Sequence, residues 1–175
     1  MGNVLRSAVP ETGSFTCDNP EVNQLFHNTL WGMRSNYLSV PTDCPQRDER
    51  LGWTGDTQMF CGAASYIGYT QKFLRKWLRD ARDSQAGYEG SYCDVIPRIF
   101  DNTVQSGTAA WGDAGLIVPD RLYRMYNDEE ILRTGNPGRH DFDTFWPTES
   151  ATWPGALAVN DAPVEEVKED KPKKP

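Results

Sequence analysis

Apolar residues recur at helical spacing in several separate segments of this chain, and this pattern is the strongest constraint on its fold. The clearest stripe follows Thr70 and opposes a row of basic side chains; it consists of Phe73, Leu74, Trp77, Leu78 and Ala81. Side chains three and four residues apart lie on one face of a helix, so each such segment must pack that face against another element. The chain is therefore predicted to be all-α, with long loops between its helices.

The first helix has clear signals at both ends. Asp18 or Asn19 is expected to cap it, and Pro20 suits its first turn, because the amide that proline lacks would be unpaired there. Its apolar positions continue to Tyr37, and Pro41 is predicted to end it. Further helices are expected at about 56–67, after Thr70 as a cap, over 112–126 with a bend at Pro119, and from 128 onward.

The pattern divides the chain into three parts. Residues 1–18 are predicted to form an extended lead-in, residues 19–133 a helical domain, and residues 134–175 an irregular to disordered tail. The segment 56–67 is apolar on most sides, with Met59, Phe60 and Ala63 among its residues, and a helix of that kind is expected to be buried.

Charge and cysteine content limit the possible partners. The formal net charge of -7 argues against nucleic acid, which requires a basic surface, whereas a neutral ligand such as a sugar fits an acidic chain. No apolar run approaches the ~18 residues that span a membrane, and the first residues lack a signal-peptide pattern, so the default expectation is a cytoplasmic protein. Four scattered cysteines and two histidines indicate reduced, buried thiols, no metal site and no cofactor.

The loop at residues 41–56 carries the most chemistry. It contains four carboxylates, two arginines and one tryptophan within fourteen residues, in the order PTDCPQRDERLGWTGD. Glycoside hydrolysis needs a carboxylic acid to protonate the leaving oxygen and a second carboxylate to act on the other side of the bond. A tryptophan face also stacks on a sugar ring. On composition alone, a solvated loop with mutually paired charges remains an alternative, and the helices alone fit a plain bundle equally well.

The run VPTDCPQRDERLGWTGD at 40–56 resembles the active-site signature of bacterial α-L-rhamnosidases of the six-hairpin glycosidase type. The resemblance extends over about residues 8–133, through TGSFTC at 12–17 and AWGDAG at 110–115. It implies an (α/α)6 barrel of twelve helices in six hairpins, of which about four helices are present here. It also implies hydrolysis of terminal α-L-rhamnose with inversion by direct attack of water.

The resemblance assigns roles to six residues. Glu49 is expected to be the general acid, and Asp43 and Asp56 are expected to accept hydrogen bonds from rhamnose hydroxyls with Arg47 beside them. Trp53 and Trp111 are expected to line the sugar pocket. In this scheme Arg47 faces Asp43. Asp48 is expected to be a paired surface charge, and Asp113 either faces the sugar or, as preferred here, caps the helix that follows it.

One part of the family pattern is not found. The family's general base is a glutamate on a later hairpin, and the last forty or so residues of this sequence do not follow the family pattern. An incomplete ring of hairpins also leaves apolar faces uncovered. The expected function is therefore that of a rhamnosidase fragment that acts on a rhamnose-containing glycoside and is inactive alone. A second chain that completes the barrel is a candidate partner. A non-catalytic sugar-binding module and an inactive gene remnant are the alternatives.

Overall fold

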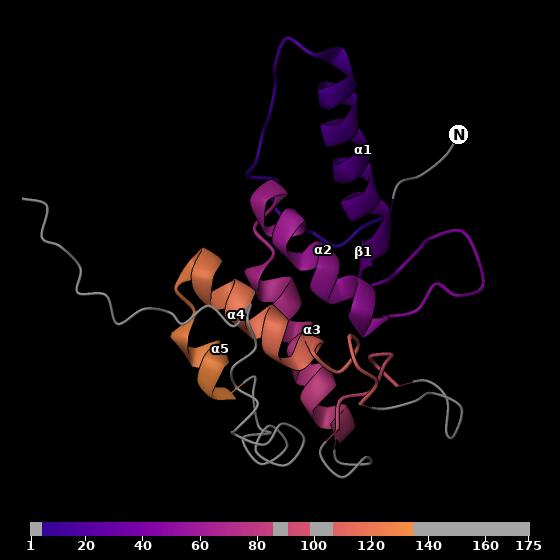
Figure 1. Ribbon diagram of the computed structural model, residues 1–175, viewed down its shortest axis with the longest axis vertical. Helices are drawn as coiled ribbons and strands as arrows, with labels where there is room; N and C mark the ends of the chain where they lie inside the picture. The colour runs from indigo at the N-terminus through magenta and orange to yellow at the C-terminus, as the bar shows by residue number, and fades with distance from the viewer. Residues whose placement is uncertain (1–4, 86–90, 99–106, 135–175) are drawn as a thin grey trace, which may run out of the picture.

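The computed structural model describes residues 5–85, 91–98 and 107–134, which form a helical fold (Figure 1). Its helices are α1 (Pro20–Asn36), α2 (Thr54–Ile67), α3 (Gln71–Gln85), α4 (Ala114–Tyr126) and α5 (Glu129–Thr134). The strands of the described part are β1 (Tyr37–Leu38) and β2 (Val40–Pro41), which pair antiparallel. None of the helices described is long and apolar enough to cross a membrane. The all-α prediction is confirmed, and the described residues form a helix in each of the five segments where one was expected.

The first helix begins as predicted but ends earlier. Asn19 caps it by accepting a hydrogen bond from the backbone of Glu21, and Pro20 opens it. The prediction that it continues to Pro41 is wrong, because the chain leaves the helix at Asn36 and turns back through Ser39, whose φ is 66°. Tyr37 fits the apolar pattern of the helix although it lies in β1, because its side chain is buried against Phe60 and Phe73.

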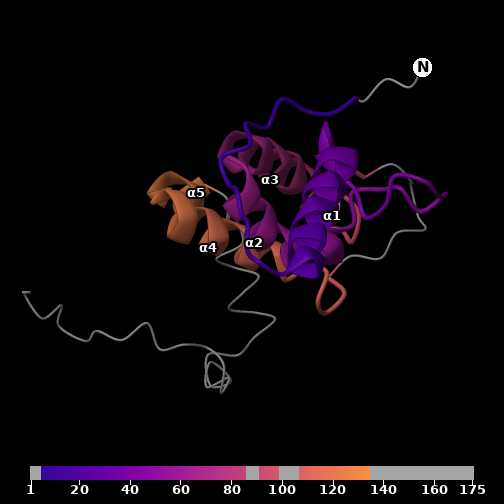
Figure 2. The same cartoon turned by 90° about the horizontal axis from the view of Figure 1, so that it is seen from above.

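The main core lies between α2, α3 and α4. The apolar stripe of α3 is buried as predicted at Leu74, Trp77, Leu78 and Ala81, and Val118 and Leu122 of α4 pack against it. Helix α4 continues through the buried Pro119. Seen from above, α2 lies between α1 on one side and α4 on the other (Figure 2). Helix α2 therefore lies in the middle of the described helices.

Helix α2 buries only some of its apolar residues, contrary to the sequence prediction that it is buried on most sides. Met59 is 81% exposed and Ala63 is also exposed. The buried positions are mostly small or polar; they are Thr54, Thr57, Gln58, Cys61, Ala64, Ser65 and Ile67. Because so many residues of this helix are apolar, hydropathy does not distinguish its inner face, whereas hydrogen bonding of the polar side chains to neighbouring loops does.

Helix α1 shows the uncovered surface that an incomplete ring predicts. Its apolar residues were predicted to form one buried face, yet Met33 is the helix's buried residue and Leu25 is 65% exposed. Figure 1 shows the N-terminal half of α1 extending away from the other helices, with the lead-in beside it. Phe15 of the lead-in contacts Phe26, and their ring centroids are 6.1 Å apart.

The cysteines and the last helix agree with expectation. All four cysteines are free, and Cys44, Cys61 and Cys93 are buried. Asp128 begins α5 by accepting a hydrogen bond from the backbone of Ile131, and it is held to α3 by an ion pair with Arg75 at 2.8 Å. The side chain of Thr70 does not act as the simple cap that was expected, because its hydroxyl lies 2.8 Å from that of Ser65 and 3.2 Å from that of Tyr126.

Candidate active site

The loop at residues 41–56 is closed at its base by Asp43. The backbone N–H of Asp43 donates to the carbonyl of Leu51 at 3.1 Å, and the Asp43 carboxylate accepts from the N–H of Leu51 at 3.0 Å. These two bonds bring both ends of the loop together and leave residues 45–50 exposed to solvent. These two hydrogen bonds to the backbone of Leu51 therefore fix the position of the Asp43 side chain.

The second side of the loop is bonded to residues 94–96. The N–H of Thr54 donates to the carbonyl of Asp94 at 2.9 Å, and the N–H of Ile96 donates to that of Gly52 at 2.8 Å. A Cβ atom on Gly52 would lie 1.9 Å from the Ile96 carbonyl oxygen, so this approach requires glycine. The start of α2, which carries Asp56, is thereby held in place.

Three of the predicted site residues line one cleft of about 530 Å³ between α1, the strand pair and α2. Asp43 and Asp56 are two of them, and Trp111 is the third, with its indole packed across Gly55. The other residues lining the cleft are Gly32, Asn36, Tyr37, Pro41, Thr42, Gly55, Thr57, Gln58, Met59, Phe60 and Ala110. A cleft of this size with two carboxylates and an aromatic ring suits a single sugar unit.

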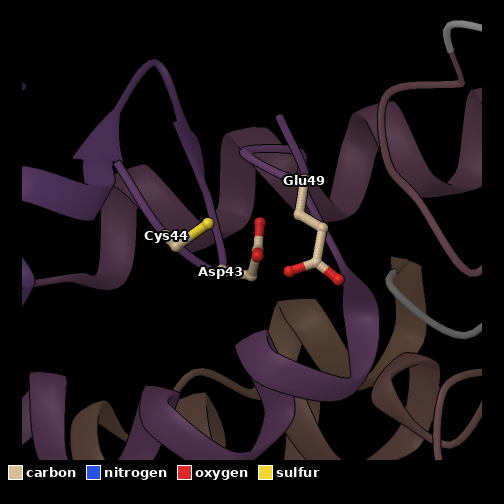
Figure 3. Close-up of side chains that lie close together, drawn as sticks. All are labelled: Asp43, Cys44 and Glu49. Atoms are coloured by element: carbon tan, nitrogen blue, oxygen red, sulfur yellow. The ribbon is translucent and has the colours of Figure 1, made fainter. Parts of the chain in front are cut away.

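Glu49 lies on the exposed part of the loop and faces Asp43. Ligand atoms of Asp43, Cys44 and Glu49 all lie within 4.8 Å of one another, and Figure 3 shows the carboxylates of Asp43 and Glu49 turned toward each other. The side chain of Glu49 is 61% exposed. Its position beside Asp43 brings a second carboxyl group close to one side of the cleft.

Arg47 does not face Asp43 as expected. Its Nε atom lies 2.9 Å from a carboxylate oxygen of Glu49, in an ion pair between two exposed side chains. The neighbouring Cys44 side chain and, next to it, the charge on Glu49 raise the pKa of Arg47. The physical reason is that Arg47 and Glu49 lie on one short turn, which brings their side chains close together. In this turn the N–H of Arg50 donates to the Arg47 carbonyl.

Asp56 is the cleft carboxylate with altered acidity. Partial burial raises its pKa above the usual value, and the nearby charge of Asp43 acts in the same direction. A hydrogen bond from its own backbone and the charge of Arg47 oppose this shift. The Asp56 carboxyl group therefore holds its proton to a higher pH than an ordinary aspartate does.

The remaining predicted residues have other contacts. Trp53 is not among the residues lining the cleft; its indole N–H donates to the Glu49 carbonyl at 3.2 Å and supports that turn. Asp113 stands before α4 in helical geometry without a side-chain cap bond, so the preferred capping role is wrong, and its carboxylate accepts from the N–H of Ala110 at 3.0 Å. Asp48 is exposed, and within the described residues it forms no ion pair.

The cluster of Asp43, Cys44 and Glu49 offers three atoms of the kind that bind metals. Cysteine binds metals as a thiolate. A hydrogen bond with Asp43 and burial raise the pKa of Cys44, which keeps this group as a neutral thiol near pH 7. Glu49 is already paired with Arg47. The contacts of Cys44 with Asp43 and of Glu49 with Arg47 therefore describe this cluster better than a bound ion does.

One residue of the cleft was missed from the sequence. Gln58 is buried on α2, and its amide donates to the backbone carbonyl of Ala110, next to Trp111. The available signal was a polar residue among apolar neighbours two positions after Asp56. Its partner lies fifty-two residues away in the chain, so the pairing itself could not be anticipated.

Comparison with known proteins finds similar chains over most of the length of this one. The model of the bacterial alpha-L-rhamnosidase 6 hairpin glycosidase domain matches residues 10–143. An alpha-L-rhamnosidase of Streptomyces avermitilis is 45% identical over 139 residues, which are 79% of this chain and 13% of that protein. One from Formosa agariphila is 42% identical over 132 residues, or 75% of this chain and 14% of that protein.

Solved structures agree with the sequence comparison. The crystal structure of the Streptomyces avermitilis alpha-L-rhamnosidase complexed with L-rhamnose superposes with a TM-score of 0.77 at 43% identity, over 82% of this chain and 14% of that one. The alpha-L-rhamnosidase from Aspergillus terreus gives a TM-score of 0.74 at 46% identity, over 78% and 16%. The chain thus spans 13% to 16% of the length of these relatives and corresponds to a fragment of a six-hairpin glycosidase domain.

Proposed function

The chain belongs to the bacterial alpha-L-rhamnosidase six-hairpin glycosidase domain family, and from this premise we propose that it supplies the general-acid side of a rhamnosidase active site. The reaction is hydrolysis of terminal non-reducing α-L-rhamnose from α-L-rhamnosides with inversion at the anomeric carbon. Glu49 is the general acid, and the cleft beside it binds the sugar. The general base is supplied by residues outside this sequence.

The observation that carries the proposal is the meeting of Asp43, Asp56 and Trp111 on one cleft with the Glu49 carboxylate beside Asp43. Carboxylates accept hydrogen bonds from sugar hydroxyls, and an indole face packs on the apolar side of a pyranose. Trp53 supports the turn that carries Glu49, because its indole N–H donates to the Glu49 carbonyl. The structural similarity to an enzyme complexed with L-rhamnose supports rhamnose as the sugar.

In the proposed reaction Glu49 gives its proton to the glycosidic oxygen as the bond from that oxygen to the anomeric carbon breaks. Positive charge develops on the sugar ring, and the cleft carboxylates stabilise it. A water molecule on the opposite face loses a proton to the base and forms the new bond. Departure of the aglycone alcohol leaves Glu49 ionised. The proton that Glu49 gives to the leaving oxygen is matched by the proton that the base takes from water.

Asp43 is too close to Glu49 to be that base. Their ligand atoms lie within 4.8 Å, whereas inverting enzymes hold acid and base about 6.5–9.5 Å apart to admit the water. Asp43 is also held by the backbone of Leu51 at the foot of the loop. Its role is therefore to bind the sugar.

The ion pair between Arg47 and Glu49 must change when substrate binds. A neighbouring cation favours an ionised carboxyl group, and a general acid must carry a proton. Both side chains are more than half exposed, and such pairs contribute little to stability because each partner remains hydrated. Arg47 is therefore free to turn toward the sugar or its other ligands at small cost.

The test is a chimaera in which residues 10–143 replace the matching segment of the Streptomyces avermitilis enzyme. We expect it to release the aglycone from an aryl α-L-rhamnoside with inversion of the first-formed sugar, followed by proton NMR. Glu49→Gln should lower the rate ~10²–10⁴-fold, with a smaller loss for activated leaving groups. Asp48→Asn, on the same turn, is the matched control and should leave the rate near that of the parent.

The opposite pattern, in which Asp48→Asn removes activity and Glu49→Gln does not, would assign the acid to Asp48. The 175-residue chain alone is expected to bind L-rhamnose weakly and to release no aglycone above the buffer blank. Turnover by the isolated chain that Glu49→Gln abolishes would contradict a base outside this sequence. Binding without any activity in the chimaera would instead favour a non-catalytic sugar-binding module.

A further inference from the structure

Helix α2 is hydrogen-bonded to the loop before α4 at Ala110. The buried amide of Gln58 donates from Nε2 to the carbonyl oxygen of Ala110. The backbone N–H of Ala110 donates to the carboxylate of Asp113 at 3.0 Å. Both backbone polar groups of Ala110 are therefore held by side chains, one on each side.

Ala110 has a backbone conformation that needs such support. Its φ is 70°, in the left-handed region that residues with a Cβ rarely adopt. The next residue is Trp111, whose N–H donates to the Thr108 carbonyl at 3.0 Å. The conformation of Ala110 thus determines the direction in which Trp111 leaves the turn.

Trp111 in turn covers the first turn of α2. A Cβ on Gly55 would lie 3.0 Å from two atoms of the indole, so the ring rests directly on that glycine. Asp56 follows Gly55, and Gln58 lies one turn below it on the same helix. Two contacts therefore join α2 to this loop. The side chain of Gln58 is hydrogen-bonded to the loop, and Trp111 of the loop packs on α2.

We propose that Gln58 is a positioning residue that sets the orientation of Trp111 in the cleft and through it the affinity for sugar. The proposal rests on the function proposed above for that cleft. Gln58 acts through Ala110. The carbonyl oxygen of its amide and the indole nitrogen of Trp111 are buried without a hydrogen-bond partner among the residues described.

These unpaired atoms argue against a purely stabilising role for Gln58. A buried polar atom without a partner opposes folding, and an apolar side chain of similar size at this position would avoid that cost. The geometry instead uses one end of the amide to hold a strained turn. Strained backbone that is held by surrounding contacts is typical of sites where a side chain must keep one orientation.

The experiment uses the full 175-residue chain labelled with 5-fluorotryptophan. The ¹⁹F resonance of Trp111 is identified by its absence in Trp111→Phe. Gln58→Met keeps the length and removes the donor, and Gln58→Asn keeps the amide and is too short to reach Ala110. Both variants should shift or broaden the Trp111 resonance and leave the other five tryptophan resonances in place. Ser65→Ala, which removes a buried hydrogen bond from the same helix, is the matched control and should not move it.

Titration with L-rhamnose supplies the second readout. The concentration for half-saturation should rise roughly threefold to tenfold in Gln58→Met, the range expected for loss of one oriented aromatic contact. Trp111→Phe should weaken binding as well, and the double variant should be no weaker than Trp111→Phe, because Gln58 acts through the tryptophan.

An unchanged Trp111 resonance in both Gln58 variants, or an equal shift in Ser65→Ala, would overturn the positioning role. Additive losses in the double variant would do the same. Failure of the wild-type Trp111 resonance to respond to rhamnose would contradict the proposed function of the cleft. The ligand-free spectra would still decide the role of Gln58, so the two failures are distinguishable.

Discussion

The two parts of the loop at 41–56 have opposite surroundings. Its flanks, Asp43 on one side and Gly52–Asp56 on the other, are bonded to Leu51 and to residues 94–96 and contribute to the cleft. Its tip, residues 45–50, is exposed throughout, and the ion pair described there joins two neighbours on one turn. The proposed sugar contacts lie on the flanks and the proposed acid lies on the tip.

This difference separates two demands on a glycosidase site. Sugar contacts must be held in place before substrate arrives, because fixed groups lose little freedom on binding. The acid must change both its protonation and its partner during the reaction, and an exposed turn permits that. We infer that the rest of the six-hairpin domain covers the tip and completes its surroundings.

The largest effect should come from adding one carbon atom to the anchored flank. In Gly52→Ala the new Cβ would lie 1.9 Å from the Ile96 carbonyl oxygen, so the backbone pairing with residues 94–96 must open. We expect a loss of ~3 kcal/mol in the free energy of unfolding, measured by urea denaturation. The control is Gly32→Ala in α1, where a Cβ meets nothing within 4 Å and a gain of about 0.5–1 kcal/mol is expected. Equal effects at both glycines would remove the distinction between anchored and free positions.

A smaller loss is expected from Thr54→Val on the same flank. Thr54 is fully buried, and its hydroxyl donates to the Asp94 carbonyl at 3.1 Å. Valine keeps the shape and removes this bond, while the backbone N–H of residue 54 still donates to the same oxygen. The expected cost is ~1 kcal/mol, against no measurable change for Thr16→Val in the exposed lead-in. A loss as large as that of Gly52→Ala would mean that this side chain holds the flank more than its backbone does.

The third effect is a pH dependence at the boundary of flank and cleft. Burial and Asp43 raise the pKa of Asp56 above its ordinary 3.8. Between that value and the raised one, the folded chain binds more protons than the unfolded chain, so stability falls as the pH rises through this window. Asp56→Asn should therefore raise the thermal midpoint at pH 7, and the difference should disappear as the pH falls toward 3.8. A lower midpoint for Asp56→Asn at pH 7 would show that its backbone hydrogen bond outweighs burial.

The same comparison explains what the sequence could predict. The helical core was predictable because the α3 stripe has one apolar face, and Asp43, Asp56 and Trp111 were predictable as a group because the motif resembles a known signature. The inner face of α2 was not predictable, because hydrogen bonds from residues such as Thr54 and Gln58 determine it and hydropathy does not. The partner of Arg47 was not either, because composition does not distinguish an acidic neighbour on the same turn from one across the loop. The assignment of Glu49 as the acid stays a prediction.

The smallest effect on folding should be at the tip, in Arg47→Gln. Arg47 and Glu49 have side chains 64% and 61% exposed, so both stay hydrated, and the attraction between them is screened by water and salt. The urea midpoint of the 175-residue chain should therefore not change beyond the error of measurement, whether the salt is low or high. In the chimaera the same substitution should still weaken hydrolysis of the rhamnoside, because Arg47 is proposed to turn toward the sugar when substrate binds. A clear loss of stability in the chain that added salt reduces would show that the tip is anchored by its charges, and the distinction between a fixed flank and an adjustable tip would fail.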